Sequence, residues 1–209
     1  MSMYKMSMYK KQLKLIIGAV SLIGFAGIAG TAQAVGFYAG ADLVQLDSEL
    51  KFKNYPANPK EKYKTSHIRL KGGIEATSWL AVEAQILSSA DDRFADIFGD
   101  TWKQETGVIL GVFAKPHMTI GSFDLYGLVG YATADAEYDC SPSCPPKFKA
   151  TLDGVAYGIG AQFLVTKKLK ISVDYMSYFD DKVTYKDGAF LEPVNQTTSG
   201  FGIGVNYTF

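Results

Sequence analysis

The sequence predicts an all-β protein, an eight-stranded antiparallel up-and-down transmembrane β-barrel, from three observations. Hydrophobic side chains recur at every second position through much of the chain, which is the period of a strand. In the clearest segments one face is apolar and the other carries glycine or charged side chains. After residue 34 no apolar run approaches the roughly 20 residues of a spanning helix, so a membrane crossing there requires strands.

Eight segments carry this pattern, and the connections between them alternate between long and short. That rhythm is typical of an up-and-down barrel with all four long loops at one end. Two of the segments, 106–114 and 123–133, have apolar residues on both faces, so their orientation stays open. The predicted strands are 37–44, 68–76, 80–86, 106–114, 123–133, 154–163, 169–176 and 199–209.

The closing segment, 199–209, indicates which face meets lipid. Its aromatic and branched side chains alternate with Gly200, Gly202 and Gly204. A glycine face suits a crowded interior better than a solvated surface, so the apolar face is expected to contact lipid.

The first 34 residues have the three-part layout of a secretory signal peptide. Four lysines precede an apolar run from Leu15 to about Ala29, and the small residues Thr31-Ala-Gln-Ala34 follow. We therefore expect cleavage after Ala34 and a barrel domain over 35–209. The part after Ala34 holds 17 basic and 21 acidic side chains, a net charge of −4. This balance disfavours a nucleic-acid partner.

Several short motifs resemble the opacity-type "porin family", small eight-stranded outer-membrane proteins related to the membrane domain of OmpA. They include Gly36-Phe-Tyr-Ala-Gly40, Leu125-Tyr-Gly-Leu-Val-Gly-Tyr131 and Asn206-Tyr-Thr-Phe209. The resemblance implies the cell outer membrane as location, with periplasmic chain ends and long loops outside. It also implies that the closing strand, through Tyr207 and Phe209, is recognised by the barrel assembly machinery.

Charged residues on the inward faces predict a luminal network. An eight-stranded lumen is just wide enough for side chains to fill, and buried ions need partners. We expect Arg69 or Lys71 to pair with a luminal carboxylate; a structural plug of ion pairs is favoured over an ion pathway. The candidate residues are Asp42, Arg69, Lys71, Glu75, Glu83 and Asp174.

The two cysteines, Cys140 and Cys144, lie in the third long loop. In an oxidising compartment a disulfide is the expected outcome. Zinc is the alternative, but two thiols without a nearby histidine make a poor zinc site, so no metal is expected.

No catalytic residues and no cofactor are predicted. Lipid A deacylases of similar architecture place a His and a Ser two positions apart on a strand, whereas His67 and His117 are followed by Arg69 and Thr119. Without a histidine set against a serine and an acid, triad chemistry lacks its base.

The sequence therefore predicts a non-enzymatic protein with a structural or surface-interaction role. The expected partners are outer-membrane lipid, lipopolysaccharide, the barrel assembly machinery and a host or cell-surface ligand at the loops. A narrow pore for ions or very small solutes is the first alternative. A soluble lipid-binding barrel is the second, and it requires the reverse orientation of charged and apolar faces.

Overall fold

The computed structural model describes residues 36–52, 60–89, 93–97, 100–141, 148–187 and 190–209. Within these ranges all regular secondary structure is β-strand. No helix among them has the length and apolarity to cross a membrane. The strands are β1 Gly36–Phe52, β2 Lys60–Glu75, β3 Leu80–Ser89, β4 Arg93–Ile97, β5 Asp100–Ile120, β6 Phe123–Ser141, β7 Phe148–Leu164, β8 Leu169–Asp187 and β9 Phe190–Thr208.

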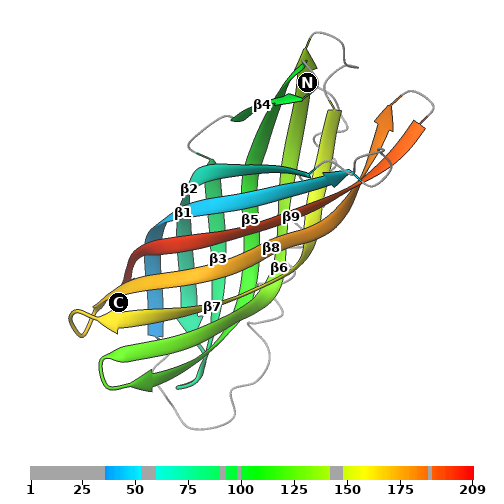
Figure 1. The fold of residues 1–209 in the computed structure, drawn as a ribbon. Coiled ribbons are helices and arrows are strands. Elements are labelled where there is room, and N and C mark those ends of the chain that lie inside the picture. The colour runs from blue at the N-terminus through cyan, green and yellow to red at the C-terminus, as the bar shows by residue number, and fades with distance from the viewer. Residues whose placement is uncertain (1–35, 53–59, 90–92, 98–99, 142–147, 188–189) are drawn as a thin grey trace, which may run out of the picture. The chain divides into compact units, whose positions relative to one another are not determined.

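The strands form one antiparallel sheet that closes on itself (Figure 1). Their order is β3-β2-β1-β9-β8-β7-β6-β5-β4, and pairing of β3 with β5 closes the ring. The short β4 pairs with β5 above the ring and is not one of its eight members. The predicted eight-stranded up-and-down barrel is confirmed.

The strands are longer than the sequence predicted. β1 and β2 stay paired from Gly36↔Glu75 to Lys51↔Lys60, through residues expected to form a polar loop. β8 and β9 likewise pair as far as Asp187↔Phe190. In this part the outward side chains, such as Asp47 and Lys64, are polar, and inward ones such as Ser48 are polar too. The apolar–polar alternation by which strands are identified is therefore lost, although the backbone ladder continues.

The predicted facing of the side chains is confirmed. Ile74 and Val205 lie on the outside, whereas Arg69 and Glu83 are buried inside. The soluble lipid-binding barrel, which needs the opposite arrangement, is excluded by this orientation.

The structure also determines the orientation of the fourth and fifth strands of the ring, β5 and β6. Ile109 and Phe113 of β5 and Tyr126 and Leu128 of β6 are buried inside. Val129 of β6 is exposed on the outside.

The connection expected to begin at Lys115 was misplaced. β5 continues through Pro116 to Ile120, and the turn is Gly121–Ser122. Pro116 is compatible with the strand because it lies near the end of β5, in the terminal pair of the β3–β5 ladder, opposite Leu80.

Gly121 has a φ of 62°, in the left-handed region that favours glycine. Nothing lies within 4 Å of the position that a Cβ would take, so the cost of a side chain there is conformational alone. We expect Gly121→Ala to lower the free energy of unfolding by about 1 kcal/mol, measured by urea titration of the refolded barrel. A loss of several kcal/mol would contradict this account of the turn.

Two sequence predictions, the signal peptide and the disulfide, depend on residues outside the described parts of the structure. The signal peptide, 1–34, lies before the first described residue, and Cys144 lies in the gap 142–147. Cys140 belongs to β6, but its side chain is not described. The cleavage site and the disulfide therefore stay predictions.

Candidate functional site

Arg69 occupies the middle of the barrel, and its side chain is completely buried. Its Nε donates to Asp42 Oδ2 at 2.6 Å and its Nη2 donates to Asp174 Oδ2 at 2.5 Å. Nη1 donates to the hydroxyl of Tyr178 at 3.1 Å, and the Tyr126 hydroxyl donates to Asp174 Oδ2 at 3.1 Å. One guanidinium thus connects β2 with β1 and β8 across the lumen.

Lys71 extends this cluster toward the short-turn end. Its Nζ lies 2.9 Å from Asp42 Oδ1 and donates to Ser172 Oγ at 3.0 Å. Asp42 therefore accepts from Arg69 and Lys71 on its two oxygens, so its charge is matched on both sides.

Glu83 is the centre of a second buried cluster. Its Oε2 accepts from Lys115 Nζ at 2.8 Å and from the Tyr38 hydroxyl at 2.7 Å, while Oε1 accepts from Gln85 at 2.8 Å. The Lys115 ammonium also lies over two aromatic rings, 4.8 Å from the centroid of Tyr38 and 4.4 Å from that of Tyr126. Cation–π contact of this kind stabilises a desolvated ammonium.

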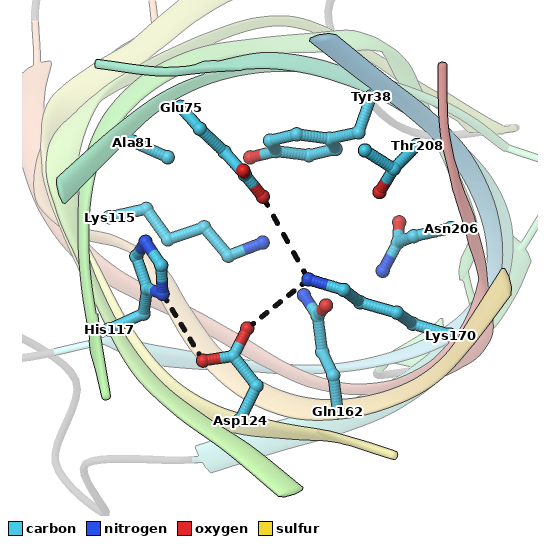
Figure 2. Close-up of a pocket in the computed structure, with 10 residues that line it drawn as sticks. All are labelled: Tyr38, Glu75, Ala81, Lys115, His117, Asp124, Gln162, Lys170, Asn206 and Thr208. Carbon is cyan, nitrogen blue, oxygen red and sulfur yellow. Dashed lines mark hydrogen bonds and ion pairs between the residues drawn. The ribbon is translucent and has the colours of Figure 1, made fainter. Parts of the chain in front are cut away.

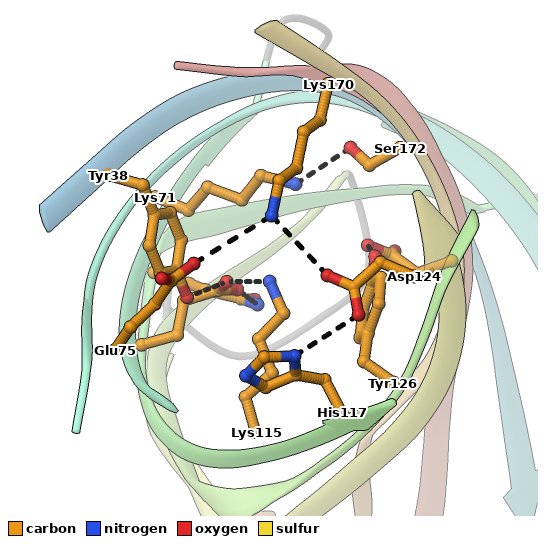
Figure 3. Close-up of polar contacts among 12 residues, drawn as sticks. Tyr38, Lys71, Glu75, Lys115, His117, Asp124, Tyr126, Lys170 and Ser172 are labelled. Atoms are coloured by element: carbon orange, nitrogen blue, oxygen red, sulfur yellow. Dashed lines mark hydrogen bonds and ion pairs between the residues drawn. The ribbon is translucent and has the colours of Figure 1, made fainter. Parts of the chain in front are cut away.

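The short-turn mouth of the barrel contains a small cavity crossed by Lys170 (Figure 2). Lys170 Nζ lies 3.5 Å from Asp124 Oδ2 and 3.8 Å from Glu75 Oε1. Asp124 also faces His117, whose Nδ1 is 3.2 Å from its Oδ1. Figure 3 shows these contacts together with those of Lys71 and Lys115, so polar side chains fill this end of the lumen.

On the long-loop side of Arg69 a group of apolar side chains is buried in the lumen, beside polar ones such as His67 and Gln196. We call this group the apolar tier: its members come from β1, β3, β5, β7 and β8, and each is at most 1% exposed. A register shift between Ser177 and Phe179 contributes to it, because Tyr178 and Phe179 are both buried there. The tier consists of Leu46, Leu87, Ile109, Leu152, Met176 and Phe179.

The structure places all six predicted luminal residues inside the barrel, with Glu75 partly exposed at the mouth. Arg69 and Lys71 both pair with Asp42. The partners of Glu83 and Glu75 are Lys115 and Lys170.

The family comparison agrees with this geometry. A family model described as outer membrane protein beta-barrel domain matches residues 17–209. The chain belongs to this family. The predicted resemblance to small OmpA-like barrels is confirmed, and the protein is located in the outer membrane.

Solved outer-membrane barrels share the fold at low sequence identity. Ail, the attachment invasion locus protein of Yersinia pestis, is 19% identical, with a TM-score of 0.51 over 83% of this chain and 99% of that one. Neisserial surface protein A is 14% identical, with a TM-score of 0.51 over 85% and 100%. A major outer membrane protein from Thermus thermophilus is 12% identical, with a TM-score of 0.53 over 85% and 100%. No curated protein sequence matches the chain.

The location of the family in the outer membrane accounts for the exposed aromatic side chains on the outside of the barrel. Tyr207 and Phe209 are exposed there, and their rings contact each other edge to face at 5.4 Å. Lys168 Nζ lies 5.7 Å from the Tyr207 centroid, an arrangement suited to a membrane interface.

The two histidines lie inside the barrel. His67 Nε2 is 3.0 Å from Thr65 Oγ1. His117 faces Asp124, which also accepts from the Thr119 hydroxyl at 3.3 Å, and His117 Nε2 has no hydrogen-bond partner among the described residues. The described side chains also contain no group of three or more potential metal ligands.

Sequence reasoning missed Lys115, Asp124 and His117 as luminal residues. The sequence analysis ended the strand at residue 114 and so placed Lys115 and His117 in a connection. It left the orientation of 123–133 open, so Asp124 could not be assigned to the inward face. The sequence did contain a signal. Lys115 and His117 lie an even number of residues after Ile109 and Phe113, the inward side chains of the same strand, and therefore share their face.

Proposed function

We propose that this protein is a non-enzymatic outer-membrane protein with a structural or surface-interaction role, exerted through its extracellular end. The observation that carries the proposal is the length of the strands beyond the lipid-facing band. On β1 the exposed apolar side chains end at Leu43, and Gln45 and Asp47 follow on the same face. Residues 44–52 then add roughly 30 Å of strand at about 3.3 Å per residue. An extended sheet of this size offers a platform for binding.

The filled lumen supports this proposal over the alternative of a narrow pore. The ion pairs around Arg69 and the apolar tier lie one above the other along the barrel. A passing ion would have to displace tightly packed apolar side chains and give up its hydration, which costs several kcal/mol. The structural neighbour named as an attachment invasion protein also fits a surface role.

The outer face of β1 and β2 suits lipopolysaccharide as a partner. Lys62 and Lys51 each lie 3.3 Å from Glu49, and Lys64 lies 3.4 Å from Asp47. These exposed lysines can exchange their carboxylate partners for lipid phosphates at little cost. Recognition of the closing strand by the barrel assembly machinery and binding of a host or cell-surface ligand belong to the same proposal.

We expect the purified protein to show no single-channel steps in planar bilayers, because the apolar tier closes the lumen. Lys170→Ala, which removes the charge that crosses the mouth, is also expected to show no single-channel steps. Regular steps that disappear in Glu83→Gln would instead establish the pore.

Adhesion is tested on cells that display the protein and on cells that lack it. Binding to immobilised host-cell extracts and to lipopolysaccharide is measured for both, with each long connection deleted in turn. Equal binding by the two cell types would overturn the surface-interaction role.

A further inference from the structure

The pairing between β7 and β8 ends partway along the two strands. These strands pair only from Tyr157↔Ser177 to Leu164↔Lys170. Beyond that point β7 continues with β6 as far as Phe148↔Tyr138, and β8 continues with β9. We call the gap between 148–156 and 178–187 the seam. Figure 1 shows the orange-to-red β8–β9 hairpin leaning away from the upper ends of β6 and β7.

Each side of the seam presents an unpaired strand edge. In an antiparallel sheet every second residue directs its N–H and C=O toward one neighbour, so alternate residues of 148–156 point across the seam. The strand pairings of the described residues give these groups no partner on that side. Such an edge is a template for another extended chain, since only an extended backbone matches its spacing of donors and acceptors.

The β7 side of the seam has space and charge for an added strand. Gly154 faces inward, yet nothing lies within 4 Å of the position of a Cβ there. Val155 on the outer face is 68% exposed. Asp153 and Asp180, on opposite sides of the seam, are exposed acids that accept hydrogen bonds from the neutral hydroxyls of Tyr131 and Thr197.

We propose that the β7 edge, residues 148–156, binds an extended polypeptide segment by strand addition. The segment carries Lys or Arg on its outer face, opposite Asp153, and an apolar side chain over Gly154 on its inner face. This inference rests on the proposed surface-interaction role and specifies the class of partner and the mode of binding.

The test uses the full barrel in lipid nanodiscs and a labelled peptide in which Lys and Val alternate over a length matching 148–156. Saturable binding is expected by fluorescence anisotropy. A second peptide has the same side chains but is N-methylated at alternate residues, which removes the donors of one edge. Strand addition predicts that this peptide binds at least about tenfold more weakly, because several backbone hydrogen bonds are lost.

Two charge-reversal variants of the protein separate the seam from general electrostatics. Asp153→Lys lies on the seam, whereas Asp47→Lys is an exposed, outward position on β1, which is paired on both sides. We expect Asp153→Lys to lower the affinity for the peptide by about tenfold and Asp47→Lys to change that affinity by less than about twofold. A heat-modifiability gel establishes that both variants are folded.

The inference is overturned if the methylated peptide binds as well as its parent, if the two variants weaken binding equally, or if no saturable binding occurs. Adhesion of cells displaying the same variants distinguishes the two proposals. Adhesion that persists unchanged in Asp153→Lys overturns strand addition and leaves the surface role standing. Adhesion no better than that of cells lacking the protein overturns the surface role itself.

Discussion

Replacing Arg69 with alanine is expected to destabilise the barrel by about 3–5 kcal/mol, because the change leaves two carboxylates buried without their shared cation. Asp174 loses its 2.5 Å partner, and Asp42 keeps the Lys71 ammonium and the Ser172 hydroxyl as donors. The hydroxyl of Tyr178 also loses its donor. The measurement is the free energy of unfolding in urea, followed by tryptophan fluorescence of the refolded protein.

Two further variants show whether charge is the cause. Lys64→Ala removes a lysine whose ion pair is exposed, so we expect it to cost less than about 1 kcal/mol. Combining Arg69→Met with Asp174→Asn removes one buried cation and one buried anion and leaves Asp42 paired with Lys71. This double variant is expected to recover much of the loss, since replacing a whole buried ion pair is often neutral. If the double variant were no more stable than Arg69→Ala, lost packing would be the explanation.

The sequence predicted the fold well because the period of two is a local property. Each side chain of a strand takes one of two faces, and a lipid-facing strand cannot carry Arg69 or Glu83 on its outer face. The closing strand showed this most directly, through its glycines on one side and its aromatic residues on the other.

The partners inside the barrel could not be predicted in the same way. Which inward residues meet depends on strand tilt and stagger, and these are properties of the closed ring. Arg69 and Asp174 are far apart in sequence, and their strands are not neighbours in the sheet. The register shift that buries both Tyr178 and Phe179 breaks the alternation on which the prediction relied.

Gly202→Val is expected to have an effect as large as the loss of Arg69. A Cβ at Gly202 would lie 2.8 Å from Arg69 Nη2 and 2.9 Å from Asp174 Oδ1. The side chain would therefore push between the two partners of the closest ion pair, adding overpacking of about 1–3 kcal/mol to the cost of separating buried charges. We expect a loss of at least about 3 kcal/mol, measured by urea unfolding.

Gly154→Val is the matched control, because Gly154 also faces inward but has open space around it. The two variants add the same side chain and remove the same backbone freedom, so a large difference between them isolates the crowding around Arg69. Equal losses would mean that valine is costly at any inward glycine. Gly202 would then have no special part in holding the ion pair, and the strand's glycines would reflect backbone requirements alone.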